Sequence, residues 1–374
     1  MSGIYLHIPF CKQKCTYCDF HFSTSFQGYR KKMIETMRDE LLLRKDYLTD
    51  KQLNSVYFGG GTPSLLKEEE FDVLFDIIKT HFTLSAETEI TIEANPDDIT
   101  IEILAIWKKM GFNRLSIGLQ SFKEEDLKWM NRAHTVSEAQ NCVELAQKNG
   151  FTNISVDLIY GLPDLTQEEW ENHIERVLQM NVQHVSAYCL TVEEKTVLHH
   201  LVETKKINPV GEDAQSEHFI YLSKRLKEAG FLHYEISNFG LPGFEAVHNS
   251  NYWRGKTYLG IGPSAHSFNG TSRQWSVSNN SAYIKNFGIN DDWFEKEVLT
   301  SKERWNELVM TGLRTSFGVD LEQLATIFPF TKSFNDKVDL FTANGWVVTD
   351  SNKLLLSDEG RLKADHIASE LFID

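Results

Sequence analysis

The sequence lacks an excess of basic residues. Lys and Arg number 38 against 53 Asp and Glu, so the formal net charge is -15. Proteins that bind DNA or RNA usually carry a basic surplus that pairs with phosphates. We therefore expect no nucleic-acid partner.

Long apolar runs are also absent. No segment approaches the ~18 consecutive apolar residues that indicate a membrane-spanning helix. The first ten residues, MSGIYLHIPF, show no basic segment followed by a long apolar stretch. We therefore expect neither a transmembrane segment nor a signal peptide.

Cysteine is scarce, with five residues in a chain of 374. An odd and small number does not make a disulfide scaffold, so we expect a reducing, cytoplasmic compartment. Cys142 and Cys189 lie in apolar contexts, where we expect both to be buried and inert. The other three stand together near the start, and no second C-x2-C pair accompanies them.

Short apolar strands alternate with helical patterns over the first 200 residues. The predicted strands are 4–8, 55–58, 89–93, 114–118, 154–159 and 184–188. The predicted helices between them are 28–46, 67–82, 101–110, 137–149 and 167–180. Six such units in series imply a parallel sheet. Because a closed barrel of this kind needs eight, we predict an α/β fold with an open, partial (β/α)6 barrel.

We expect three regions along the chain. Residues 1–200 form the partial barrel, and residues 201–299 form a connecting extension with a mixed, polar and aromatic pattern. Residues 300–374 show three helices, a β-hairpin and a last helix, which is the outline of a small winged-helix-like α+β domain. Acidic residues outnumber basic ones there, so we do not expect this domain to bind DNA.

Chemically unusual residues follow the predicted strands. Cys11 comes after the first strand, the segment GGGTPS at 59–64 after the second, and Glu93 stands at the third. Gln120 follows the fourth, and Asp157 lies within the fifth. In a parallel barrel these positions share the carboxyl-end face, where ligands bind. We therefore expect the loops to form one site.

Cys11, Cys15 and Cys18 have the spacing C-x3-C-x2-C. Three thiolates so close in sequence can face one metal centre, yet structural zinc and four-iron clusters normally take four ligands. A cluster held by three Cys leaves one iron open to a further ligand. Zinc completed by His7 or His21 is the alternative, although structural zinc motifs usually come as two pairs. We favour an iron–sulfur cluster.

The glycines at 59–61 have two interpretations. They can let the backbone approach a ligand and bind its polar ends through exposed N–H and C=O groups. They can also serve only as a tight turn between a strand and a helix. Beside a metal loop with an open position, ligand binding is the interpretation that we favour.

Glu93, Gln120, Arg132 and Asp157 are candidate ligand contacts. Charge that is buried at a strand end must be paired with another charge or with a ligand. The alternative for each is a structural ion pair, and Arg132 has acidic residues nearby at 125–126.

A further set of histidines and aromatic residues lies in the connecting region. Its members are His233, His248, Tyr252, Trp253 and His266. Histidine beside aromatic residues can ligate haem iron or border a large planar ring. A buried histidine with a structural role is the alternative for each one.

The motifs, taken in order, resemble those of the radical S-adenosylmethionine (radical SAM) superfamily. H-I-P-F-C-x3-C-x-Y-C is followed by G-G-G-T-P-S, and the similarity extends over essentially the whole length. Within the superfamily the chain is most similar to the branch that contains HemN, the oxygen-independent coproporphyrinogen III oxidase, and the haem chaperone HemW.

The resemblance implies specific cofactor contacts. Cys11, Cys15 and Cys18 would bind a 4Fe-4S cluster, whose fourth iron takes the amino and carboxylate groups of S-adenosylmethionine. The residues implied to lie at the S-adenosylmethionine site are Tyr5, Gly60, Gly61, Thr62, Glu93, Gln120, Arg132 and Asp157. The run His248-Asn249-x-x-Tyr252-Trp253 resembles the H-N-x-x-Y-W signature of the HemW branch, which implies haem binding.

Two departures from HemN decide between the branches. Cys18 is followed by Asp19 and Phe20, where HemN has Gly and a further Cys, and this chain starts just ahead of the first predicted strand. We therefore expect a haem chaperone that passes haem to acceptor proteins, such as membrane-associated respiratory ones. Decarboxylation of coproporphyrinogen III and a structural zinc protein remain the alternatives.

Overall fold

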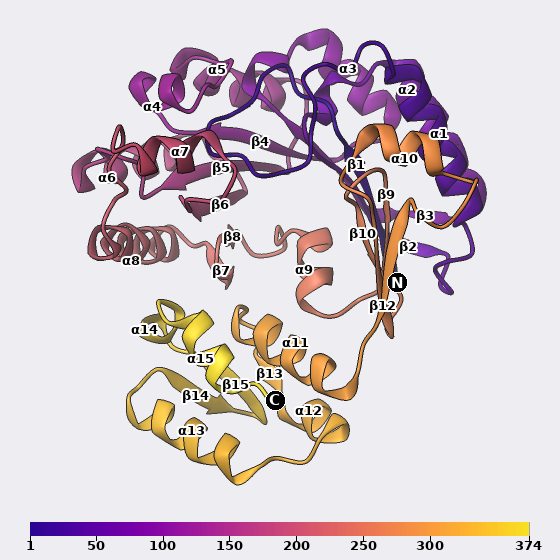
Figure 1. Cartoon of the computed structure of the whole chain (residues 1–374). Coiled ribbons are helices and arrows are strands. Elements are labelled where there is room, and N and C mark those ends of the chain that lie inside the picture. Colours follow the sequence, from indigo (N-terminus) through magenta and orange to yellow (C-terminus); the bar gives the residue numbers. More distant parts are fainter. Residues whose placement is uncertain (374) are drawn as a thin grey trace.

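The computed structural model describes residues 1–373, and Asp374, the end of the predicted C-terminal region, lies outside them. Two hydrophobic cores organise the molecule (Figure 1). The larger contains buried residues between Ile4 and Trp293, and the smaller those between Trp305 and Leu371. No helix within residues 1–373 combines the length and apolar character needed to cross a membrane.

The larger core is built on a twelve-stranded sheet in the order β12-β11-β10-β9-β1-β2-β3-β4-β5-β6-β8-β7. Its six central strands are β1 (Ser2–Ile8), β2 (Gln52–Gly60), β3 (Thr83–Ala94), β4 (Arg114–Gln120), β5 (Ile154–Tyr160) and β6 (His184–Cys189). All six pair in parallel with their sequence neighbours. The prediction of an open, partial barrel is confirmed, since the sheet has two edges and does not close.

The helices of the repeating units lie along the outer side of the curved sheet (Figure 1). They are α1 (Arg30–Leu43), α2 (Glu68–His81), α3 (Ile101–Met110), α4 (Glu124–Trp129), α5 (Val136–Lys148) and α6 (Gln167–Gln179). Their starts follow from side chains that satisfy free backbone N–H groups. Thr135, for example, forms a capping box with Glu138.

The connecting region extends the sheet on both sides, which the mixed sequence pattern did not predict. Its strands are β7 (Leu232–Glu235), β8 (Asn238–Gly240), β9 (Tyr258–Ile261), β10 (His266–Phe268), β11 (Ser272–Ser276) and β12 (Phe294–Val298). Its helices are α7 (Val197–Glu203), α8 (Glu212–Glu228), α9 (Val247–Trp253) and α10 (Asn280–Asn286). β9 pairs in parallel with β1, so it prolongs the barrel wall, whereas the other added strands are antiparallel.

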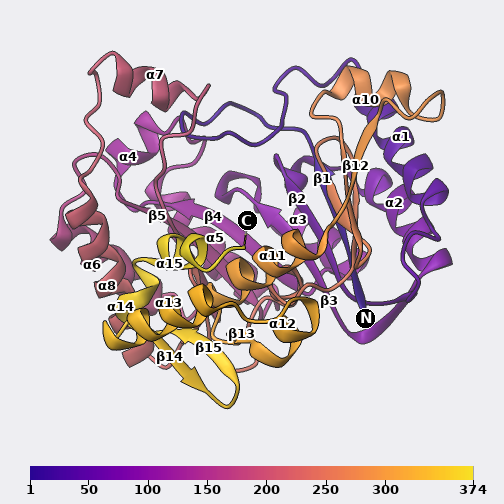
Figure 2. The ribbon, with the colours of Figure 1, turned by 60° about the horizontal axis from the view of Figure 1, so that its bottom comes forward.

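The smaller core has the predicted order of helices and a hairpin, except that two short helices stand where a single last helix was predicted. Its elements are α11 (Ser301–Leu313), β13 (Val319–Asp320), α12 (Leu321–Ile327), α13 (Lys332–Ala343), β14 (Val347–Asp350), β15 (Lys353–Leu356), α14 (Asp358–Arg361) and α15 (Ala364–Glu370). β13 adds an unpredicted third strand to the hairpin. This unit lies at one end of the barrel, and the loop after β1 crosses the other end between α7 and α10 (Figure 2).

Candidate functional site

A cavity of about 410 Å³ opens at the carboxyl ends of the parallel strands. The predicted site residues that line it are Cys11, Cys15, Cys18, Gly60, Gly61, Thr62, Glu93, Gln120, Arg132 and Asp157. These residues come from loops and strand ends between β1 and β5, and they meet because parallel strands place their carboxyl ends at one face. The expectation of one shared site is confirmed.

The cysteine loop is held from both sides. The N–H of Cys11 donates to the carbonyl of Ser23 at 3.1 Å, which closes the loop on itself. The hydroxyl of Thr62 donates to the Sγ of Cys11 at 3.4 Å. On the far side, Arg132 Nη1 donates to the Sγ of Cys15 at 3.6 Å. These contacts fix the positions of two of the three sulfur atoms at the cavity.

The three thiols fit a cluster better than a single ion. Within residues 1–373, no three His, Cys, Asp or Glu side chains are grouped closely enough to surround one metal ion. A 4Fe-4S cluster needs no such grouping, because each Cys binds a different iron. Burial raises the pKa of the Cys11 thiol to about 12 and that of Cys18 to about 11, and metal coordination would deprotonate both.

The glycine loop lies against the cysteine loop. Gly60 has φ of +103°, and a Cβ there would lie 2.6 Å from Nδ1 of His7. A Cβ on Gly61 would lie 2.7 Å from the carbonyl oxygens of Ile8 and Phe10. Only glycine permits this approach of two backbones. The N–H of Gly61 donates to the carbonyl of Ile8 at 2.9 Å, and both glycines form part of the cavity wall beside the cysteines.

Two half-buried carboxyl groups, those of Glu93 and Asp157, face the cavity. Glu93 accepts from the hydroxyl of Tyr57 at 2.8 Å and from the N–H of Gly60 at 3.2 Å. Ser116 donates to Asp157 at 3.3 Å. Burial raises the pKa of Glu93 to about 7 and that of Asp157 to about 6. Such groups can accept hydrogen bonds from ribose hydroxyls, and binding a ligand would compensate for their desolvation.

Arg132 points into the cavity rather than to the acidic residues at 125–126. Its Nη2 donates to Asn95 Oδ1 at 2.6 Å and to the carbonyl of Gly118 at 2.9 Å. Its Nε is buried and has no hydrogen-bond partner within the described part of the chain. Gln120 lies beside it with φ of +68°, an unusual conformation for a residue with a side chain. Strained backbone and an unpaired buried donor are both typical of a ligand site.

Tyr5 lies inside the barrel and is not part of the cavity lining. Its ring stacks on Tyr57 with centroids 6.0 Å apart, and its hydroxyl is 3.2 Å from Nδ1 of His7. Tyr57 was not predicted as a site residue, yet it holds Glu93. The sequence signal that could have indicated Tyr57 is its position, as a polar aromatic residue two positions before the glycines at 59–61.

Asn95, Tyr188 and Cys189 also line the cavity. The expectation that Cys189 is an inert, buried thiol is therefore wrong about its position.

The haem-signature residues lie elsewhere, at the amino ends of the strands. His248 is 1% exposed, and its Nδ1 lies 2.8 Å from the Ser55 hydroxyl. Its Nε2 lies 2.8 Å from the Tyr252 hydroxyl. Burial lowers the pKa of His248 to about 3, so the ring is neutral. In this conformation neither ring nitrogen is free for iron.

This segment and the cavity lie at different heights along the strands, and Tyr57 connects them. Its ring stacks on His248 with centroids 5.0 Å apart, and its hydroxyl donates to Glu93 in the cavity. Ser55 and Gly60 are five residues apart on β2, which corresponds to about 16 Å at the usual strand rise. Glu89 fixes the start of α9, because its carboxylate accepts from the N–H groups of Val247 and His248, each at 2.9 Å. Arg114 lies 3.8 Å from the same carboxylate. These interactions attach α9 across the end of the barrel.

The remaining histidines of the connecting region do not join either group. His233 is buried, with Nδ1 3.0 Å from the Ser223 hydroxyl and Nε2 3.2 Å from the carbonyl of Ile236. His266 is exposed and stacks on Trp275. The structural interpretation therefore suits His233, and His266 lies exposed on β10, a strand with neighbours on both sides.

Two family models match the chain. A radical SAM superfamily model covers residues 5–177, and a HemN C-terminal domain model covers residues 299–362. A protein of Mycobacterium tuberculosis (strain ATCC 25618 / H37Rv) named heme chaperone HemW is 33% identical over 373 residues. That alignment covers 99% of this chain and 94% of the relative.

A second relative has the same name as the first and is also similar to this chain over its full length. A heme chaperone HemW of Lactococcus lactis subsp. lactis is 31% identical over 379 residues, covering 100% of this chain and 98% of the relative. Among solved structures, coproporphyrinogen III oxidase (HemN) from Escherichia coli, described as a radical SAM enzyme, matches with a TM-score of 0.84. It is 22% identical and is covered over 89% of its length, against 99% of this chain, and the likeness shows a shared fold.

Proposed function

The chain belongs to the HemW family of the radical SAM superfamily, and we propose that it is a haem chaperone that delivers haem to acceptor proteins. The observation that carries this proposal is the similarity over nearly the full length to proteins named heme chaperone HemW. The H-N-x-x-Y-W segment, at the barrel end away from the cysteines, supports the same assignment.

In this proposal the carboxyl-end cavity holds the cofactors. Cys11, Cys15 and Cys18 bind the 4Fe-4S cluster, and the glycine loop at 60–62 lies against the methionine end of S-adenosylmethionine. The remaining contacts are Tyr5, Glu93, Gln120, Arg132 and Asp157. If S-adenosylmethionine is cleaved here, the cluster held by the three cysteines would supply the electron, and these residues would orient the cosubstrate and exclude water.

Haem binds through the other end of the barrel. His248, Tyr252 and Trp253 are the proposed haem contacts, with His248 as the candidate iron ligand. Ligation would require breaking one of its two hydrogen bonds, to Ser55 or to Tyr252. We propose a cytoplasmic protein that meets haem acceptors of the respiratory chain, some of them in the membrane.

A second candidate is oxidative decarboxylation of coproporphyrinogen III. The fold likeness to HemN favours it, because the match extends over both cores. Asp19 and Phe20 after the third cysteine argue against it, because HemN has Gly and a further Cys there.

One anaerobic experiment separates the two candidates. The reconstituted protein is titrated with haem, then given coproporphyrinogen III, S-adenosylmethionine and a reductant. We expect stoichiometric haem binding, transfer to an apo-acceptor, and no protoporphyrinogen. Turnover without haem binding would assign the chain to the decarboxylating enzymes.

A further inference from the structure

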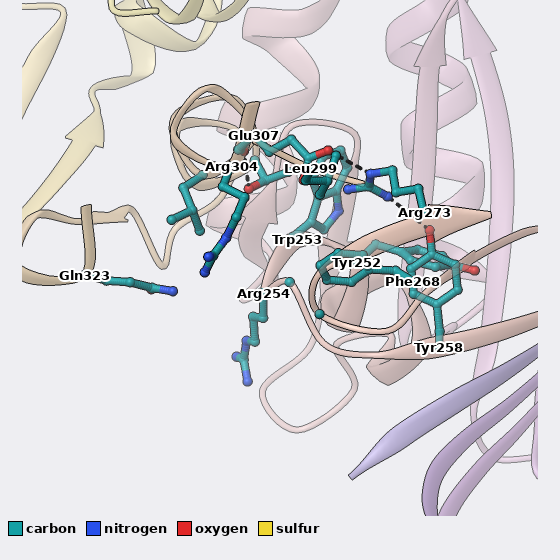
Figure 3. Close-up of a pocket in the computed structure, with 14 residues that line it drawn as sticks. Tyr252, Trp253, Arg254, Tyr258, Phe268, Arg273, Leu299, Arg304, Glu307 and Gln323 are labelled. Atoms are coloured by element: carbon teal, nitrogen blue, oxygen red, sulfur yellow. Dashed lines mark hydrogen bonds and ion pairs between the residues drawn. The ribbon is translucent and has the colours of Figure 1, made fainter. Parts of the chain in front are cut away.

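A second cavity, of about 390 Å³, lies where the barrel meets the C-terminal unit. Its walls come from α9 and the loop after it, from β10 and β11, and from α11 and α12 (Figure 3). The residues that the argument uses are Tyr252, Trp253, Arg254, Arg273, Arg304 and Glu307. Two of these belong to the haem signature, and the others are not assigned any role above.

The face of α11 that borders this cavity is distinct from the face that packs into the small core. Arg304, Glu307, Leu308 and Thr311 recur at the i, i+3, i+4 and i+7 positions of one helical stripe and line the cavity. Trp305, Val309 and Leu313 lie on the opposite side and are buried in the core. Leu308 also packs against the small core, so the side chains of this face that can meet a ligand are the polar ones, Arg304, Glu307 and Thr311.

The cavity is positively charged in an acidic protein. It has three arginines and one glutamate, a formal charge of +2, whereas the whole chain carries -15. Arg273 is already neutralised, since its Nε lies 2.7 Å from Glu307 and its Nη1 donates to the Tyr258 hydroxyl at 3.3 Å. Two uncompensated guanidinium groups, those of Arg254 and Arg304, remain.

These two arginines are placed to receive carboxylates. The guanidinium of Arg254 lies over the ring of Phe317, 3.9 Å from its centroid, which fixes the group and leaves the in-plane N–H groups free. Arg304 has no ion pair or hydrogen bond from its side chain within residues 1–373. Both arginines line the same cavity as Trp253 (Figure 3). Arginine binds carboxylates through two parallel N–H···O bonds.

We propose that this cavity binds a flat, largely apolar ring with two carboxylates, Arg254 and Arg304 each pairing with one carboxylate and Tyr252 and Trp253 bordering the ring. Haem has this chemistry, so the inference rests on the proposed haem function and locates its propionates. The site lies at the amino ends of the strands, so the ligand does not compete with S-adenosylmethionine for the carboxyl-end cavity.

The test compares haem with its dimethyl ester, which keeps the ring and iron but lacks both negative charges. Wild-type protein is expected to bind haem at least tenfold more tightly than the ester. The double variant Arg254→Ala/Arg304→Ala is expected to bind haem at least tenfold more weakly and to lose the preference. Iron-free protoporphyrin IX and its dimethyl ester should show the same pattern, because the carboxylates are recognised independently of the iron.

A matched control removes two positive charges from the outside of α1, as Lys31→Ala/Arg38→Ala, and should behave as wild type. Thermal unfolding and the absorbance of the reconstituted cluster establish that both variants are folded. A double variant at Arg254 and Arg304 that keeps wild-type affinity and preference would overturn the inference alone. Wild-type protein that binds neither haem nor ester would overturn the proposed function as well.

Discussion

The two ends of the barrel differ in the surroundings of their titratable side chains: those of the carboxyl end line an open cavity, whereas His248 and Glu89 at the amino end are enclosed. Each end has buried polar atoms without a hydrogen-bond partner in the described chain, and at the amino end these are Arg114 Nε and Ser250 Oγ. At the carboxyl end, Arg132 Nε and Thr16 Oγ1 are buried without partners in the described chain, and burial raises the pKa of Glu93 and Asp157. At the amino end, both ring nitrogens of His248 are hydrogen-bonded, and Glu89 accepts from two backbone N–H groups of α9.

The carboxyl end therefore has the properties of a ligand site, and the amino end those of a junction that stabilises the fold. Unpaired buried groups destabilise the folded chain, and they persist where a ligand satisfies them. Fully paired groups stabilise a junction and lose that stabilisation when one partner is removed. Substitutions at the carboxyl end should therefore abolish cofactor binding with little loss of stability, whereas those at the amino end should lower stability first.

The largest effect is expected for Cys15→Ala. The variant should lose the iron–sulfur cluster and with it the absorption near ~400 nm expected of such centres. Its apoprotein should unfold much like wild-type apoprotein, because the thiol is half-buried and its loss removes only weak hydrogen bonds, with Arg132 and Tyr17. Iron and sulfide analysis after anaerobic reconstitution gives the result. Cys142→Ala is the control and should keep the full absorption; unchanged iron content in Cys15→Ala would refute the cluster assignment.

The next largest expected effect is a loss of stability and of haem affinity, caused by a substitution at the amino end of the barrel. His248→Ala should lower the free energy of unfolding by about 2–4 kcal/mol, since it leaves a cavity, removes the partner of the Tyr252 hydroxyl and leaves Ser55 with Asn251 as its remaining side-chain partner. Haem affinity should fall more than tenfold, about 1.4 kcal/mol. Urea denaturation and a spectral haem titration measure the two quantities. His266→Ala, at an exposed ring, is the control; equal haem affinity in His248→Ala would move the haem site elsewhere.

The smallest expected effect is an increase in the free energy of unfolding, whereas His248→Ala lowers it. Between pH 4.5 and about 7, folded protein holds a proton on Glu93 that unfolded chains have lost, so the free energy of unfolding falls as pH rises through this window. At pH 8, Glu93→Gln should therefore be more stable than wild type, by on the order of 2 kcal/mol, yet bind S-adenosylmethionine more weakly. Denaturation at pH 5 and pH 8 tests this; a stability gain of equal size at both would exclude titration of Glu93 as its cause.

Much of the fold and the cofactor site could be predicted from local patterns. Strand-forming runs and helix starts such as Thr135-x-x-Glu138 indicate the six units, because apolar periodicity and capping are encoded within short segments. The positions just after the strands then indicate the site, since parallel topology places them on one face. Cys11 and Glu93 were both found in this way.

The amino end could not be predicted in the same way. The short strand β9 pairs with β1 across the whole intervening chain, and nothing local in the segment around Tyr258 indicates that partner. The role of His248 likewise depends on Ser55 and Glu89, which come from two strands far away in the sequence. Tyr252 and Trp253 could be recognised in the sequence as part of a motif, but no sequence pattern indicated that Arg254 and Arg304 border the same cavity.

The sequence by itself determined the family, the six parallel units and the three cysteines, since these depend on spacing along the chain. The tertiary structure alone decided which buried charges are paired and which are not. It also placed the haem signature and the cysteines at opposite ends of one barrel. Pairing depends on groups brought together from distant segments, and the energy of a buried charge depends on whether such a partner is within reach.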